Sequence, residues 1–278
     1  AATGVDLAIA LEGEPGRIGV PAGVRDVIGR RLSRLSDDAN RLLAIGAPCE
    51  VSFSLPVGAA VAGMEEDVAL DALDRAIAAQ IVQPTSVFDE YRFTHALFRH
   101  VLVEEMNPSR QVRAHRALAE ATEARVTGSP TPAQAAALLR HYECSAALPG
   151  AERGVEHAIA VADDAARSFA PAEEHDAVTR ALELLADGDE RRLDLVERHA
   201  RTSLFAGLDQ DAILRSVTRA VDEVRERRGV DAACDLVAGL VMDGFYIGDV
   251  AVPWAIARLG APLDLGGHDH PAATAEDP

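Results

Sequence analysis

His95 stands where a strand pattern changes to a helix pattern, in the run RFTHALFR of residues 92–99. An imidazole at this point, together with the free amides of a helix N-terminus, can bind a phosphate group. The alternative is a local role, in which His95 caps or packs against its own helix. Arg99 and His100 carry the same choice between a phosphate contact and a solvated helix face.

Four arginines follow one another on an early segment of helical pattern: Arg25, Arg30, Arg31 and Arg34. Guanidinium groups bind phosphates and carboxylates through forked donors, so this run predicts contacts to phosphate or to an acidic partner domain. A solvated face is the alternative. Arg25, Arg30, Arg31 and Arg99 are the candidate phosphate or partner contacts.

Metal and catalytic signatures are incomplete. His141 and Cys144 share a helical face, and residues 268–270 read His-Asp-His, but each group supplies too few ligands for a closed metal site. The chain contains no lysine, which excludes a standard GxxxxGK[ST] phosphate-binding loop. The GxSxG and HExxH motifs are also missing, and acidic clusters near residues 163 and 174 are predicted to be solubilising charges. We therefore predict no metal site, no catalytic residue and no enzyme activity for this segment.

Composition narrows the class of protein. The 27 basic residues face 45 acidic ones, which leaves a net charge of −18 that repels a nucleic-acid backbone. Hydrophobic residues make up 48% of the chain and aromatic residues only 4%, which favours closely packed helices. Three scattered cysteines and the lack of a long apolar stretch predict a cytoplasmic protein without a membrane span.

Apolar spacing predicts four helices and a hairpin before residue 107. The first helix opens at Pro21, the second lies between an N-cap at Ser36 and a stop at Pro48, and the third follows Ser54. The apolar stripe of the fourth helix is expected to be Val68, Leu70, Leu73, Ile77 and Ile81. A period-two pattern over residues 81–84 and 91–94 predicts the hairpin.

Helices followed by one short hairpin are the order of a winged-helix domain, although other compact α+β modules share it. In a DNA-binding winged helix, the helix that enters the groove would cover residues 65–80. This segment carries five carboxylates against Arg75 alone, so we expect it to contact protein and not DNA.

Helical pattern continues from about His95, with breaks at residues 107–108, 128–132, 149–150, 171, 188, 207 and 229. Helix pairs of approximately 34 residues are typical of stacked repeats, and predict a degenerate tetratricopeptide-like array. Its apolar stripes are expected at Val155, Ile159, Ala162, Ala166 and Phe169; at Val178, Ala181, Leu182 and Leu185; and at Ile213, Val217, Val221 and Val224. Phe245, Tyr246 and Trp254 are expected to complete a terminal packing layer, with an exposed peptide groove as the alternative.

These patterns predict a mostly α fold: a winged-helix domain with a small β-hairpin, followed by an α-helical, tetratricopeptide-like repeat array. We place a linker or a remnant of a preceding domain at residues 1–18, the winged helix at 19–107, the repeats at 108–265 and a flexible tail at 266–278.

Residues 20–36, VPAGVRDVIGRRLSRLS, with the following segment at 39–43, resemble large bacterial regulators that carry a STAND-type ATPase module, namely the LuxR-type ATP-binding regulators and related cyclase-linked proteins. Residues 67–79, 91–99 and 113–119 resemble the same proteins, and residues 141–185 are similar to their tetratricopeptide-like arm. The resemblance covers roughly residues 19–190.

The resemblance implies a signalling relay, in which an ATPase core binds nucleotide, a winged helix packs against it and a helical arm senses an inducer or partner. His95 is similar to the histidine that contacts the nucleotide phosphate, although Ala96 stands where many relatives have Asp. The phosphate-binding loop, the magnesium-binding acidic strand and the C-terminal LuxR-type helix-turn-helix are absent from the sequence. The chain is therefore expected to be either an excised middle section or a shortened relative.

The resulting hypothesis is a non-catalytic regulatory segment that couples nucleotide state to partner binding. It would bind no cofactor alone, but would respond to ATP or ADP within a full-length protein. Its partners would be an ATPase core in cis or in trans and an effector or protein on the helical arm, with no direct nucleic-acid or membrane binding. The alternatives are an enzyme that uses His95, His100 and nearby carboxylates, and a DNA-binding winged helix.

Overall fold

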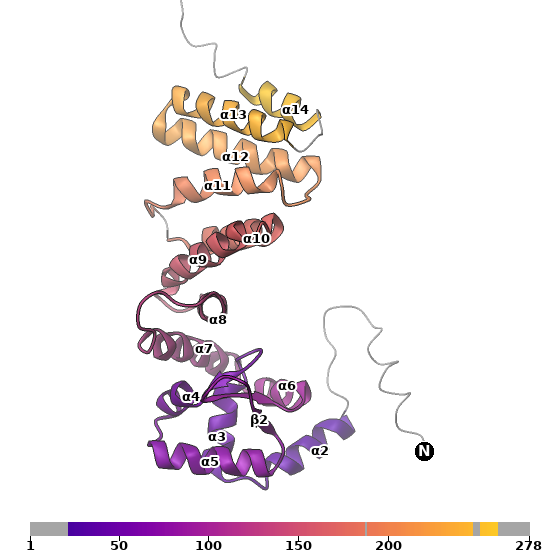
Figure 1. Ribbon diagram of the computed structural model, residues 1–278, viewed down its shortest axis with the longest axis vertical. Helices are drawn as coiled ribbons and strands as arrows, with labels where there is room; N and C mark the ends of the chain where they lie inside the picture. The colour runs from indigo at the N-terminus through magenta and orange to yellow at the C-terminus, as the bar shows by residue number, and fades with distance from the viewer. Residues whose placement is uncertain (1–21, 187, 247–250, 261–278) are drawn as a thin grey trace, which may run out of the picture. The chain divides into compact units, whose positions relative to one another are not determined.

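The computed structural model describes residues 22–186, 188–246 and 251–260, and is mostly helical with one small sheet (Figure 1). The chain divides into two compact units. The first comprises Ala1–Ser129 and Cys144–Pro149, and the second comprises Pro130–Glu143 and Gly150–Pro278. Among the described residues, no helix is both long and apolar enough to cross a bilayer.

The first unit combines six helices of the described chain with a three-stranded sheet. Its elements are α2 (Ala22–Leu32), α3 (Asp37–Gly46), β1 (Phe53–Ser54), α4 (Leu55–Ala62), α5 (Glu66–Ala78), β2 (Val82–Pro84), β3 (Glu90–Phe93), α6 (Ala96–Glu105) and α7 (Pro108–Glu123). The sheet is antiparallel in the order β1-β3-β2, with Phe53 opposite Tyr91 and Val82 opposite Phe93. The predicted hairpin is confirmed, whereas β1 was not predicted because two residues show no period.

Local signals explain where several of these helices begin and end. The Ser36 side chain accepts a hydrogen bond from the Ala39 amide, and Asn107 does the same for Arg110, so both act as N-caps. The end of α3 packs on the sheet, where a Cβ at Gly46 would lie 2.8 Å from the Phe53 ring. Only glycine allows this close approach.

Helix α5 buries only part of the face expected, which includes Leu73. Its buried residues are Ala69, Ala72, Leu73 and Ala76, whereas Val68 and Leu70 are exposed. The prediction followed the larger side chains, but a helix crossing α3 at close range is packed through its small residues.

The second unit is a succession of helices in which, from the second helix onward, each packs on the next (Figure 1). They are α8 (Pro132–Cys144), α9 (Gly154–Arg167), α10 (Pro171–Leu184), α11 (Arg192–Ser203), α12 (Gln210–Arg228), α13 (Val230–Phe245) and α14 (Ala251–Gly260), with a short 3-10 turn at Ala151–Arg153. The chain breaks fall where Pro and Gly predicted them. Helix α7, which the sequence assigned to the repeats, belongs instead to the first unit because it packs on α4.

The core of the second unit is aliphatic. The predicted stripes on α10 and α12 are buried, including Val178, Ala181 and Val217. On α9 the buried face is Val155, Ala158, Ala162 and Ala165, so the expectation that Ala166 and Phe169 join it is wrong. The predicted terminal layer is also wrong, because Phe245, Tyr246 and Trp254 are exposed.

Candidate functional site

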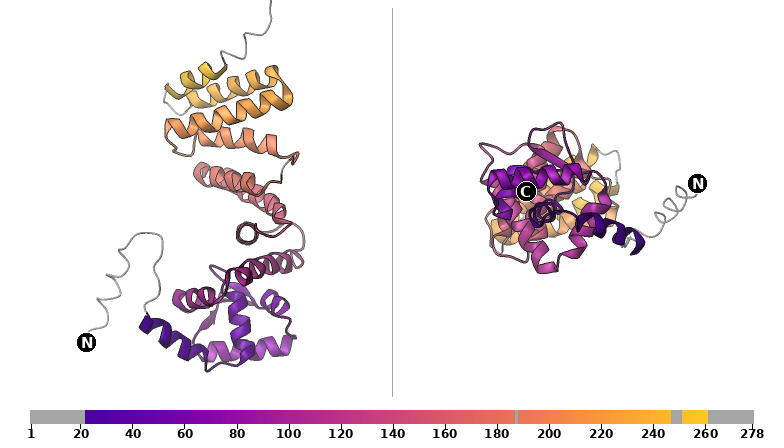
Figure 2. Two further views of the ribbon diagram at one scale, coloured as in Figure 1. Left: turned by 180° about the vertical axis from the view of Figure 1, so that it is seen from behind. Right: turned by 90° about the horizontal axis from the view of Figure 1, so that it is seen from below.

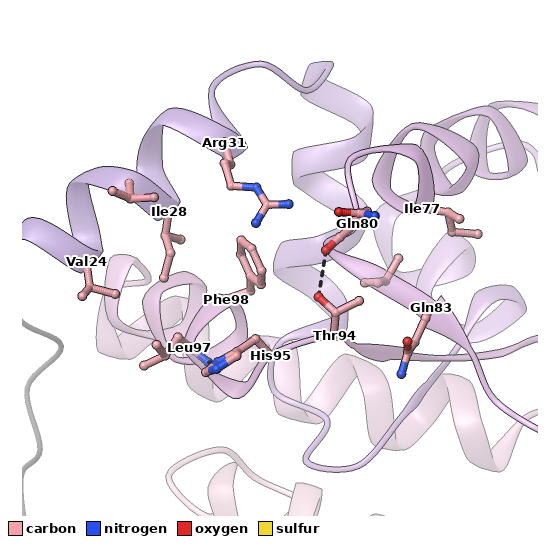
Figure 3. A pocket seen from close by; sticks show the side chains of 12 residues that line it. Val24, Ile28, Arg31, Ile77, Gln80, Gln83, Thr94, His95, Leu97 and Phe98 are labelled. Atoms are coloured by element: carbon pink, nitrogen blue, oxygen red, sulfur yellow. Dashed lines mark hydrogen bonds between the residues drawn. The ribbon is translucent and has the colours of Figure 1, made fainter. Parts of the chain in front are cut away.

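A groove of about 580 Å³ opens on the first unit between α2, the end of α5, β2 and the start of α6 (Figure 3). Val24, Ile28 and Leu97 contribute apolar walls, and Arg31 and His95 contribute the groups that can carry positive charge. The groove therefore joins an apolar surface to two anion-binding side chains that lie 64 residues apart in the sequence.

His95 is the N-cap of α6. Its backbone is extended, and its Nδ1 accepts a hydrogen bond of 3.3 Å from the Leu97 amide. This bond leaves the proton of the neutral ring on Nε2, which is also a donor when the ring is protonated. His95 therefore presents an N–H at the start of a helix, where the helix dipole favours an anion.

Arg31 is held on the opposite side of the groove by two contacts. Its Nη2 donates a 2.7 Å hydrogen bond to the carbonyl of Ala79, at the end of α5. Its guanidinium carbon lies 5.0 Å from the centroid of the buried Phe98 ring, in cation–π geometry (Figure 3). A guanidinium has five N–H donors, so this arrangement fixes the group while leaving donors for a bound anion.

The part of the groove between Arg31 and His95 is formed by the turn that ends α5. Gln80 adopts the left-handed conformation (φ 55°), and the Ile81 amide donates back to the Ala76 carbonyl. The Thr94 hydroxyl donates a 2.8 Å hydrogen bond to the Gln80 carbonyl (Figure 3). This bond joins the residue before His95 to the end of α5.

Gln80 and Thr94 were not singled out from the sequence. The signal that could have identified Gln80 is the change from helical to strand spacing of the apolar residues after Ala79, which places residue 80 at the end of a helix. Phe98 was likewise visible only as part of the quoted run, because its role as a platform depends on α2 crossing α6.

The other predicted site residues lie outside the groove. Arg25 forms a 2.7 Å ion pair with Glu104, which also lies 3.2 Å from His100. Arg30 is exposed on the outer side of α2, and Arg99 is half-buried on α6 away from the lining. Of the four candidate arginines, only Arg31 shares the groove with His95.

The two incomplete sets of possible metal ligands noted in the sequence do not extend into larger groups in the described residues. His141 is buried whereas Cys144 is exposed, and residues 268–270 lie outside the described residues. In the described ranges, no group of three or more His, Cys, Asp or Glu side chains is arranged to hold a metal ion.

A second polar cluster, missed from the sequence, joins α10, α11 and α12. The rings of His175 and His199 lie 4.3 Å apart between centroids. Thr202 donates its hydroxyl proton to the His199 carbonyl, so it accepts from Nδ1–H of His175 at 3.0 Å. Nδ1 of His199 lies 2.7 Å from the Ser216 hydroxyl.

The histidine cluster favours neutral rings. Burial, the neighbouring His175 and the charge of Arg219 lower the pKa of His199 to about 4, and burial lowers the pKa of His175. The contacts of the two rings with each other, with Thr202 and with Ser216 join α10, α11 and α12.

No family model matches the chain, and no curated protein matches it in sequence. Among solved structures, the chain is similar to a Signal Transduction ATPase with Numerous Domains (STAND) protein with a tetratricopeptide repeat sensor from Pyrococcus horikoshii. The two share 12% sequence identity with a TM-score of 0.46 over 88% of this chain. The chain spans 37% of the length of that structure.

Proposed function

We propose that this chain is a non-catalytic regulatory segment of a STAND-type ATP-binding regulator. In this proposal the first unit is a winged helix that senses the phosphates of a nucleotide held by an ATPase core, and the second is a tetratricopeptide-like arm that binds a partner. The observation that carries the proposal is the groove whose lining combines His95 and Arg31 with apolar side chains such as Val24 and Ile28.

The order of elements supports the winged-helix assignment. Helices α3, α4 and α5 precede the β2–β3 hairpin, and β1 completes a small antiparallel sheet. The outer side of α5 exposes Glu66, Asp67, Asp71 and Asp74. These carboxylates would repel a phosphate-lined groove, which favours protein contacts over DNA binding.

The donor set fits a phosphate. Nε2–H of His95, the start of α6 and the free donors of Arg31 can each bind a phosphate oxygen. ATP and ADP differ by one phosphoryl group, so a groove that contacts the terminal phosphate would stabilise different conformations in the two states. The bound nucleotide supplies this difference in charge, and the chain itself breaks no bond.

Titration of the full chain with pyrophosphate, ADP and ATP tests this proposal, with the imidazole signals of His95 followed by NMR. We expect weak but saturable shifts at His95 with pyrophosphate at millimolar concentrations, because this chain supplies only part of the proposed nucleotide site, and no release of phosphate from ATP. His95→Ala should weaken pyrophosphate binding about tenfold, the value of one charge-assisted hydrogen bond.

His100→Ala is the matched control, because His100 lies on the same helix but outside the groove. Equal losses in the two variants, or no response of His95 to pyrophosphate, would contradict phosphate sensing. Hydrolysis of ATP by this chain would contradict its non-catalytic assignment and support the enzyme alternative.

A further inference from the structure

The second unit exposes aromatic side chains at the ends of alternate helices. Phe169 is 93% exposed after α9, Phe205 is 42% exposed after α11, and Phe245 and Tyr246 are 50% and 84% exposed at the end of α13. We call these four residues the aromatic edge. The chain has only 11 aromatic residues (7 Phe, 3 Tyr and 1 Trp). The exposure of four of them on this unit is therefore not explained by an excess of aromatic residues over the space in the core.

The helices bring the four residues to one side of the second unit. Helices α9 to α13 alternate in direction, so the C-terminal ends of α9, α11 and α13 lie along the same edge, on the right in Figure 1 and on the left in the turned view of Figure 2. Packed helix axes are 8–10 Å apart, and α11 also packs directly on α13, so the aromatic edge extends for about 25 Å.

Phe169 combines exposure with an unfavourable backbone. It has φ 54° and occupies the left-handed position of a helix end, where the Ala170 amide donates to the Ala165 carbonyl. Glycine is the usual residue here because a Cβ strains this conformation. The exposed ring gains no packing that would offset the strain, so the fold of the unit does not explain a phenylalanine at this position.

Negative charge surrounds the aromatic edge. Five carboxylates lie within five residues of its members along the described chain: Asp164, Glu173, Glu174, Asp209 and Asp243. Three of these carboxylates are ion-paired within the unit: Asp164 with Arg167 at 3.1 Å, Asp243 with Arg201 at 3.5 Å and Glu174 with Arg198 at 2.8 Å. The five carboxylates still outnumber these three arginines, so the surface keeps a net negative charge that favours a positively charged ligand.

We propose that the aromatic edge docks a basic, apolar segment of a partner protein. Apolar side chains of the segment would cover the rings, while its Arg or Lys residues would contact the carboxylates and the aromatic faces. A length of about 25 Å corresponds to about seven extended residues. The proposal rests on the partner-binding role proposed above for the second unit, and names the surface and the chemistry of that partner.

Fluorescence anisotropy on the full chain tests the proposal, with a labelled synthetic probe of alternating Leu and Arg, about 12 residues long. A probe with Glu in place of Arg is its control. We expect saturable binding of the Arg probe, weaker binding at high salt, and no binding of the Glu probe. The double variant Phe169→Ala, Tyr246→Ala should bind at least tenfold more weakly, with an unchanged helical circular dichroism spectrum.

Phe88→Ala is the matched variant, because Phe88 is 90% exposed in the β2–β3 turn of the first unit. Equal weakening by Phe88→Ala, equal binding of both probes, or no saturable binding would overturn the proposal. Loss of a dimer in the double variant, measured by sedimentation, would assign the edge to a second copy and overturn it as well. His95→Ala should leave probe binding unchanged, so a failure of phosphate sensing is distinguishable from a failure here.

Discussion

Histidine side chains occupy two contrasting environments in this chain. His95 is exposed at the start of α6, where Nδ1 accepts a hydrogen bond from the Leu97 amide and leaves Nε2 as the nitrogen that carries the proton of the neutral ring. His199 is packed against His175 inside the helical unit, where charge is disfavoured. Residue type alone separates neither role, because solvent access and the partner of Nδ1 decide both.

The histidine cluster predicts a dependence of stability on pH. The native pKa of His199, about 4, lies below the unfolded value of 6.5, so the unfolded state binds the proton first as pH falls. Its contribution is complete above pH 6.5 and is lost as pH falls from 6.5 through about 4, a change on the order of 2 kcal/mol.

Urea unfolding of the wild type and of His199→Asn at several pH values checks this expectation. The wild-type free energy of unfolding should fall between pH 6.5 and 5, where carboxylates titrate little, and the slope should be smaller in the variant. Some slope should remain, because burial lowers the pKa of His175 in the same direction. An identical slope in both proteins would show that folding does not lower the pKa of His199.

Phe169 is a position where a substitution should stabilise the protein. Replacing it with Gly should raise the free energy of unfolding by about 1 kcal/mol, because glycine adopts φ 54° without strain. Phe169→Ala keeps the strained Cβ and should be close to the wild type. Thermal unfolding of the two variants isolates the backbone effect, and a Gly variant no more stable than the Ala variant would refute it.

At the scale of elements, periodicity predicted helices better than it predicted their buried faces. The α12 face was right because valine and isoleucine recur at the core positions. The α5 and α9 faces were right only in part. Leu73 and Val155 are buried as predicted, but alanines supply most of the remaining contact, and Val68, Leu70 and Phe169 are exposed. Side-chain size is a good guide to burial only where helices are far enough apart to need filling.

The sequence predicted some residues of the candidate site and missed others. His95 was found because a strand-to-helix change is visible in the sequence. Arg31 was one of four arginines, and its position seven residues after Val24 and three after Ile28 puts it on the apolar face of α2. The turn at Gln80 and the platform at Phe98 could not be predicted, since they depend on how α2, α5 and α6 cross.

Close helix packing gives a prediction for Gly154 at the start of α9. An added Cβ would lie 2.7 Å from both Leu184 Cδ1 and Tyr142 Cβ, so Gly154→Ala should destabilise the chain by about 1–3 kcal/mol. Gly29→Ala in α2 meets no atom within 4 Å and should stabilise it by about 0.5–1 kcal/mol. Chemical denaturation of both variants measures the difference, and the prediction fails if the two shifts share a sign.

At the scale of the whole molecule, two hydrophobic cores lie in separate stretches of the sequence. The first draws on residues from Ile28 to Leu102, and the second on residues from Leu139 to Ile256. Because each core buries its own aliphatic side chains, each unit has its own source of stability.

Separate cores predict two unfolding transitions in a calorimetric scan. Leu43 in the first core and Leu240 in the second are both fully buried. Leu43→Ala and Leu240→Ala should each cost about 2–5 kcal/mol, and each should lower the temperature of a different transition. A single transition that both variants lower equally would show that the units unfold together.

The guanidinium of Arg31 has a consequence for any occupant of the groove. The bond from Arg31 to the Ala79 carbonyl is one of the attachments between α2 and the end of α5. An anion that draws Arg31 toward itself competes with that carbonyl. Anion binding and the attachment of α2 to the end of α5 therefore weaken each other. Binding of an anion in the groove would therefore weaken the attachment of α2, and a partner that holds α2 in place would weaken anion binding.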